Sequence, residues 1–196
     1  MTSNENRWLN TRRASGDDYD ASYLRRAAAG ENVHGEVDFI QRFGPASVLD
    51  AGCGTGRVAR ELARRGIEVC GVDLDPGMLG TAQRQAPHLD WRLDDLAVVD
   101  AGRRFDLVVM AGNVMIFVTP GTEAGVIANM ARHLNAGGRL IAGFQLQSGR
   151  LSIEQYDELA AEAGLSLVER WATWDRDTYV AGGSYAVSVH QEPAGD

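Results

Sequence analysis

The segment at residues 50–56 reads Asp-Ala-Gly-Cys-Gly-Thr-Gly and carries the clearest chemical signal in the sequence. It lies between an apolar run that ends at Val48 and Leu49 and an amphipathic run that stops at Gly66. Such runs predict a buried strand followed by a helix. Glycine has no side chain to hold a ligand away from the peptide groups, and it adopts backbone angles that other residues avoid. The sequence therefore predicts a loop whose backbone touches a ligand directly.

The spacing of the glycines and the acid that precedes them indicate which ligand this is. A dinucleotide-binding fold needs the pattern G-x-G-x-x-G, with the pyrophosphate at the helix N-terminus. Counted from Gly52, the third glycine of that pattern would fall at residue 57, which is Arg57. Asp50, at the end of the predicted strand, would repel a pyrophosphate and attract an ammonium group. The segment thus predicts a ligand that carries an amine, and it argues against a nicotinamide-dependent dehydrogenase.

Residues 48–56 closely resemble the first motif of class I S-adenosylmethionine-dependent methyltransferases. Further matches follow in order between residues 46 and 190, so the resemblance does not depend on the glycines alone. Residues 67–75 resemble the second strand of that family, 91–96 the third, 105–110 the fourth and 134–140 the turn into the fifth. The resemblance implies S-adenosyl-L-methionine as cofactor and S-adenosyl-L-homocysteine as product.

The resemblance also implies roles for the acids. Asp50 and the backbone of the glycine segment would hold the amino-acid end of the cofactor, and Asp73 would hold both ribose hydroxyls. Asp95 with Leu96 would bind the adenine, whereas a one-residue slip gives that role to Asp94. A helix cap is the structural alternative for Asp73. The predicted cofactor-binding residues are Asp50, Gly52, Cys53, Gly54, Gly56, Asp73, Leu74, Met78, Asp94, Asp95, Leu96, Met110, Asn113, Tyr19 and Tyr23.

The candidates for chemistry at the methyl group lie near the N-terminus. Tyr19 and Tyr23 are one helical turn apart and share a face, so they could close over a sulfonium, whose charge suits an aromatic wall. His34 could act as a general base near neutral pH. We therefore take His34 and Tyr23 as the catalytic candidates. Packing of an N-terminal helix and an ordinary loop position are the structural alternatives.

The acceptor is defined mainly by motifs that are missing. Residues 111–117 lack both the Asn-Pro-Pro-Tyr-like motif of nucleobase and glutamine methylation and the nucleophilic cysteine of cytosine-carbon methylation. The sequence has no evident pair of glutamates for arginine methylation and no metal-ligand triad. Asn113, Trp174 and Arg176 are the candidate acceptor contacts, with a turn and a surface ion pair as their structural alternatives.

These observations predict an enzyme that methylates O, N or C of a small molecule by in-line displacement. Catalysis would come mainly from proximity and orientation, so no nucleophilic side chain is required. The alternative is a cofactor-binding or regulatory protein on the same fold, without catalysis.

Composition excludes several other classes. The formal net charge of −8 argues against a nucleic-acid substrate. The chain has no lysine, which excludes Schiff-base chemistry and a P-loop. Cys53 and Cys70 have no metal-binding or disulfide spacing. Residues 1–13 are polar and contain arginine, so we expect no signal peptide, no membrane partner and a cytoplasmic location.

The elements that must position these residues alternate between strand and helix, which predicts a parallel α/β sheet. The resemblance implies a Rossmann-like three-layer sandwich with seven strands in the order 3-2-1-4-5-7-6 and strand 7 antiparallel. We expect one compact domain, with residues 1–45 as an N-terminal helical cap and 46–192 as the S-adenosylmethionine-binding core. Helices are predicted at residues 17–29, 36–43, 75–85, 121–134 and 152–164, and the last two strands at 165–174 and 184–190.

Overall fold

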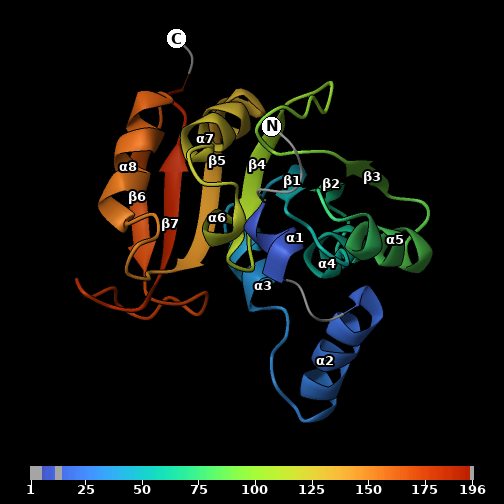
Figure 1. Cartoon of the computed structure of the whole chain (residues 1–196). Helices are drawn as coiled ribbons and strands as arrows, with labels where there is room; N and C mark the ends of the chain where they lie inside the picture. Colours follow the sequence, from blue (N-terminus) through green and yellow to red (C-terminus); the bar gives the residue numbers. More distant parts are fainter. Residues whose placement is uncertain (1–5, 12–14, 195–196) are drawn as a thin grey trace.

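The computed structural model describes residues 6–11 and 15–194. Within these ranges, seven strands form one sheet in the order β3-β2-β1-β4-β5-β7-β6 (Figure 1). β7 is antiparallel to both of its neighbours, and the other pairs are parallel. The predicted fold is confirmed. The strands are β1 (Ser47–Ala51), β2 (Glu68–Asp73), β3 (Asp90–Leu93), β4 (Phe105–Met110), β5 (Leu134–Gln145), β6 (Ser166–Trp171) and β7 (Tyr185–Gln191).

Helices begin where the sequence supplies caps. Asp75 accepts hydrogen bonds from the N–H groups of Gly77 and Met78, and Ser152 forms a capping box with Gln155. Both caps were predicted from the sequence. The helices are α1 (Arg7–Thr11), α2 (Gly16–Ala28), α3 (Gly35–Gln41), α4 (Arg57–Arg64), α5 (Pro76–Gln85), α6 (Val114–Phe117), α7 (Glu123–Arg132) and α8 (Ile153–Glu162).

The bounds of several elements differ from the prediction, most clearly those of one helix and one strand. The helix expected over residues 121–134 is shorter, because Thr122 belongs to a turn closed by its N–H on the carbonyl of Thr119. At the other end, Leu134 already pairs with Phe105 in the ladder between β4 and β5. The strand expected over 165–174 ends at Trp171, where the chain enters a turn. The short helices α1 and α6 were not predicted.

Buried side chains form two clusters, one on each face of the sheet. Alternate residues of β1 serve different clusters: Leu49 belongs to one, and Val48 to the other. The cluster with Leu49 includes side chains of α7 and α8, and the cluster with Val48 includes side chains of α3 and α4. The sheet is therefore the middle of three layers, as expected.

The site is positioned by the carboxyl ends of the central strands. From β1 the chain passes through α4 to β2 on one side, and later returns to β4 on the other side of β1. Ligands of open α/β sheets bind at such a switch point, because the loops that follow the two strands diverge there. No helix in the described ranges is long and apolar enough to cross a membrane.

Candidate functional site

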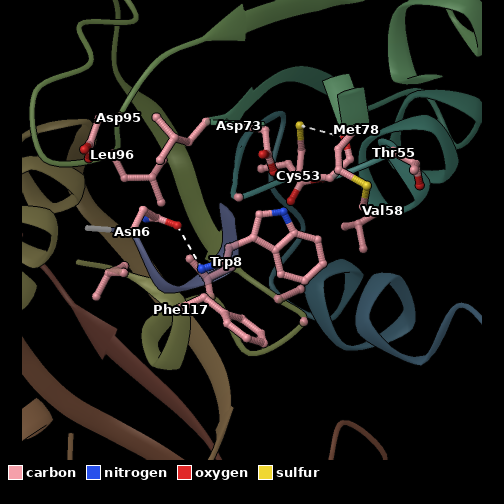
Figure 2. A pocket seen from close by; sticks show the side chains of 18 of the residues that line it. Asn6, Trp8, Cys53, Thr55, Val58, Asp73, Met78, Asp95, Leu96 and Phe117 are labelled. Carbon is pink, nitrogen blue, oxygen red and sulfur yellow. Dashed lines mark hydrogen bonds between the residues drawn. The ribbon is translucent and has the colours of Figure 1, made fainter. Parts of the chain in front are cut away.

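A cavity of about 130 Å³ lies at the carboxyl ends of the central strands (Figure 2). Its wall includes the glycine segment after β1, the residues after β2 and β3, and the segment that follows β4. Three residues from the described N-terminal part of the chain, Asn6, Trp8 and Tyr19, also line the cavity. Ten of the predicted site residues line this cavity: Tyr19, Asp50, Gly52, Cys53, Gly54, Asp73, Leu74, Met78, Asp95 and Leu96.

The glycine segment is folded tightly against the end of β2. The N–H groups of Gly52 and Cys53 both donate to the carbonyl of Val72, at 2.8 and 3.0 Å. Gly52 has a φ of 78°, and a Cβ atom placed there would lie 2.5 Å from a methyl carbon of Val114 in α6. Glycine is therefore required at this position by both backbone angle and space.

Asp50 is the most deeply buried acid of the cavity wall, with only 1% of its surface exposed. Its Oδ2 atom accepts a hydrogen bond from the N–H of Ala59 in α4 at 3.0 Å. Burial raises the pKa of Asp50 to about 7, because the ionised form has lost most of its hydration. A cationic group in the cavity would favour the ionised carboxylate, which makes Asp50 a good partner for an ammonium group.

Asp73 and Asp75 divide two tasks at the end of β2. Asp75 caps α5, as described above, so Asp73 is not the helix cap. Asp73 fixes the loops, because its Oδ2 accepts from the N–H of Gly54 at 2.7 Å and its Oδ1 from the N–H of Asp75 at 2.8 Å. Burial raises the pKa of Asp73. A carboxylate has about four lone-pair positions, so this side chain retains acceptor capacity at the cavity wall.

Of the two neighbouring acids after β3, Asp95 lines the cavity and Asp94 does not. The Oδ1 atom of Asp95 accepts from the N–H of Ala97 at 2.9 Å, which fixes its orientation. Asp94 is exposed, and its carboxylate accepts from the N–H of Asp95. Asp95 rather than Asp94 is therefore placed to contact a ligand in the cavity, a choice between two acids that the sequence left open.

Besides Asp94, and Tyr23 described below, three predicted cofactor residues lie outside the cavity. Gly56 is the N-cap of α4 and packs against the ring of Trp91. Met110 is fully buried in the hydrophobic core. The side chain of Asn113 is directed to the backbone, because its Oδ1 accepts from the N–H of Gln145 at 2.8 Å.

The two predicted tyrosines of α2 are placed differently. Tyr19 lines the cavity, whereas Tyr23 does not. Their hydroxyl oxygens lie 3.3 Å apart, and the guanidinium of Arg57 lies 4.4 Å from the centre of the Tyr23 ring. Arg57 also forms an ion pair with Glu36 and donates to the carbonyl of Val33. Tyr23 therefore contacts Tyr19 through its hydroxyl group but does not itself face the cavity.

The three remaining candidates do not line the cavity. His34 is the N-cap of α3, where its side chain makes no capping hydrogen bond. The indole N–H of Trp174 donates to the hydroxyl of Tyr185 at 3.1 Å, and its ring packs on Phe39. Arg176 is exposed in the turn after β6, with a φ of 69°.

Sequence reasoning missed part of the wall, including residues of two segments that have no periodic pattern. Trp8 belongs to a polar stretch, where a lone large aromatic residue was the only available signal. Phe117 belongs to α6, which is only four residues long. The wall residues that were not predicted include Asn6, Trp8, Thr55, Arg57, Val58, Val114, Phe117, Val118 and Thr119.

Comparison with known proteins identifies the family. Residues 48–138 match the family described as a methyltransferase domain. The solved structure of a TehB-like SAM-dependent methyltransferase from Corynebacterium glutamicum is 35% identical, with a TM-score of 0.82, and the match covers 90% of this chain and 97% of that one. The chain belongs to the SAM-dependent methyltransferases.

Curated relatives of this methyltransferase act on different compounds. The demethylmenaquinone methyltransferase of Tropheryma whipplei is 34% identical over 97 residues, which is 48% of this chain and 39% of that protein. The dTDP-3-amino-3,4,6-trideoxy-alpha-D-glucopyranose N,N-dimethyltransferase of Streptomyces venezuelae is 28% identical over 132 residues, 64% of this chain and 54% of that protein. The chain therefore spans 39% and 54% of the lengths of these relatives.

The cavity wall of this methyltransferase fits the cofactor of its family. S-adenosylmethionine carries an ammonium group, two ribose hydroxyls and an adenine amine, all of which donate hydrogen bonds. Three acids line the cavity from separate elements: Asp50 and Asp73 from the ends of β1 and β2, and Asp95 from the loop after β3. The match between donors and acceptors supports the cofactor expected from the sequence.

Proposed function

We propose that this chain transfers a methyl group from S-adenosylmethionine to an oxygen, nitrogen or carbon atom of a small-molecule acceptor. The observation that carries the proposal is the convergence of Asp50, Asp73 and Asp95 on one cavity beside the glycine segment. Asp50 and the glycine backbone hold the amino-acid end of the cofactor, Asp73 holds the ribose, and Asp95 with Leu96 holds the adenine. Leu74 and Met78 pack beside the adenosyl group, as their place in the cavity wall supports.

When bound, S-adenosylmethionine supplies a methyl group on a positively charged sulfur, which is reactive toward an attacking atom in line with the bond. The protein has to align the two reactants and exclude bulk water. Val114, Phe117 and Val118 give the cavity an apolar side that serves the second task. Tyr19 faces the same cavity and is our choice for the aromatic wall near the sulfonium. Tyr23 acts through Tyr19, and His34, Trp174 and Arg176 have no part in this arrangement.

The N-terminal helices complete the site in this proposal, with residues 1–45 as a cap on the core of residues 46–192. Two contacts of α2 support this. Asp17 accepts from the hydroxyl of Thr81 in α5 at 2.8 Å, and Asp20 pairs with Arg60 of α4 at 2.7 Å. These contacts hold α2 against the helices that follow β1 and β2, and they place Tyr19 at the cavity.

A small molecule is the acceptor that the relatives support. Those described above act on a quinone precursor and on an amino sugar nucleotide, as their names state. Among the residues that line the cavity, Arg57 is the basic one, and its guanidinium is paired with Glu36. The cavity therefore offers an acceptor apolar and hydroxyl contacts rather than an unpaired positive charge.

Two measurements test the proposal. Calorimetry should detect binding of S-adenosylmethionine and S-adenosylhomocysteine but not of NAD, because acids line the place where a pyrophosphate would lie. Incubation with S-adenosylmethionine and a panel of small metabolites should then yield S-adenosylhomocysteine and an acceptor heavier by one methylene unit. Binding of NAD without binding of S-adenosylmethionine would contradict the proposal. Cofactor binding without turnover on any acceptor would favour a non-catalytic protein.

A further inference from the structure

The short helix α1 contributes to the cavity wall, although it precedes the region that matches the family by about forty residues. Asn6 and Trp8 both line the cavity, and Figure 2 shows the Trp8 indole between Asp73 and Phe117. The Oδ1 atom of Asn6 accepts from the N–H groups of Trp8 and Leu9, at 2.9 and 3.3 Å, and so caps the helix. The indole is thereby presented to the cavity from an ordered turn.

Contacts on two sides hold α1 in place. On one side, the indole N–H of Trp8 donates to Oδ2 of Asp75, the cap of α5, at 2.9 Å. On the other, the Trp8 ring meets the ring of Phe117 edge to face, with centroids 5.2 Å apart. The guanidinium of Arg7 donates to the carbonyl of Ile116 at 3.4 Å. The helix therefore joins the loop after β2 to α6 after β4, across the switch point of the sheet.

A helix of five residues is not stable in isolation. Helix nucleation costs free energy, and only a longer helix forms enough hydrogen bonds to offset that cost. The position of α1 depends on the contacts just described, each of which contributes about 1 kcal/mol. None of the residues 7–11 is fully buried, so α1 has no hydrophobic core of its own. Such a segment can lift from the cavity at modest cost and close again on a ligand.

We propose that α1 is a strap over the cofactor site and that Trp8 is its latch, packing on the bound cofactor and holding it in the cavity. This inference rests on the proposed function, because it assigns S-adenosylmethionine to this cavity. The strap lifts when the cofactor enters and when S-adenosylhomocysteine leaves. Trp8 is thus a cofactor-contact and positioning residue, and it takes no part in bond making.

The kinetics of S-adenosylhomocysteine binding test the latch. We expect Trp8→Ala to raise the dissociation rate constant about tenfold, because ring packing and the indole hydrogen bond are both lost. Trp8→Phe keeps the ring and loses the N–H, so its dissociation should be about threefold faster. Asp75→Asn keeps an oxygen to cap α5 while offering an amide to the indole, and should resemble Trp8→Phe. Stopped-flow measurements with competing unlabelled ligand give these rates.

Tryptophan fluorescence gives an independent readout, since the chain has four tryptophans. S-adenosylhomocysteine should change the emission of the wild-type protein. The control variant Trp171→Phe should show the same change, because the Trp171 indole donates to Glu169 in β6, far from the strap. The change should be absent in Trp8→Phe. Thermal unfolding of each variant shows that the fold is retained.

The outcomes separate the latch from the proposed function. If wild-type protein binds S-adenosylhomocysteine but Trp8→Ala and Trp8→Phe release it at the wild-type rate, the latch is wrong and the cofactor site stands. Tighter binding by Trp8→Ala would also overturn the inference, because it would mean that the indole occupies the cofactor's place. If wild-type protein binds neither adenosyl compound, it is the proposed function that fails.

Discussion

At the scale of single residues, Asp50 gives the site a dependence on pH. Its pKa of about 7 means that the carboxyl group of the free protein is largely protonated in mild acid. A bound ammonium group requires the carboxylate, so binding releases a proton whenever the pH is below that pKa. We expect the affinity for S-adenosylmethionine to fall by up to about tenfold per pH unit below 7.

Calorimetry between about pH 5.5 and 7.5 checks this, and the proton release can be measured in buffers of different ionisation enthalpy. The range stops there because the α-amino group of the ligand itself loses its proton near pH 8. Asp50→Asn should bind more weakly at pH 7.5 and lose most of the slope. A wild-type affinity that does not vary over this range would show that Asp50 does not meet the ammonium group.

The pair Asp94 and Asp95 offers a second test at this scale. Asp95→Asn keeps an oxygen for the N–H of Ala97 but turns an amide toward the cavity, where it would oppose the adenine amine. We expect about tenfold weaker binding of S-adenosylmethionine, in line with the loss of one hydrogen bond to a charged acceptor. Asp94→Asn should leave the affinity unchanged, because Asp94 is exposed and outside the cavity. The reverse pattern would mean that Asp94 faces the adenine.

At the scale of elements, the glycine segment depends on the close approach of α6. Gly52→Ala adds a Cβ atom 2.5 Å from Val114 and imposes a φ of 78° on alanine. We expect a loss of about 2–4 kcal/mol in the free energy of unfolding, combining backbone strain with overpacking. Unfolding in denaturant measures this loss of free energy for Gly52→Ala against the wild-type protein. Gly102→Ala is the matched control, since its φ is 70° and no atom lies within 4 Å of the added carbon.

The control should lose only the strain of about 1–2 kcal/mol. Adding Val114→Ala to Gly52→Ala should recover part of the difference, because it removes the methyl groups that clash. If Gly52→Ala and Gly102→Ala unfold at the same denaturant concentration, α6 does not constrain the glycine segment as described.

The elements that could be predicted from the sequence are those with local signals. Asp75 before Pro76 and Ser152 before Gln155 mark helix starts by their own chemistry, and both are found in the structure. Helices α1 and α6 could not be predicted, because they are held by contacts between distant segments. The hydrogen bond from Trp8 to Asp75 spans 67 positions in the chain, and no periodic pattern records it. About half of the residues that line the cavity, Tyr19 of α2 among them, were therefore accessible to sequence reasoning, whereas the parts of the wall formed by α1 and α6 were not.

At the scale of the whole molecule, one ligand would join loops that follow different strands with the N-terminal helices. The acids come from the ends of β1 and β2 and from the loop after β3, and Tyr19 and Trp8 come from α2 and α1. A ligand that binds only this assembled state stabilises it by mass action. We expect S-adenosylhomocysteine at 100 times its dissociation constant to raise the free energy of unfolding by about 2.7 kcal/mol. For a chain of this size, that is a rise of about 5–11 °C in Tm.

Thermal unfolding at increasing ligand concentration measures this rise. NAD at the same concentrations is the control and should leave Tm unchanged. Trp8→Ala should show a smaller rise at equal ligand concentration, because its dissociation constant is larger and less of the folded state is occupied. When ligand is adjusted to 100 times each variant's own dissociation constant, the rises should become equal. A rise that stays smaller in Trp8→Ala under that condition would mean that the substitution alters the unfolding transition itself, and not only the retention of the ligand.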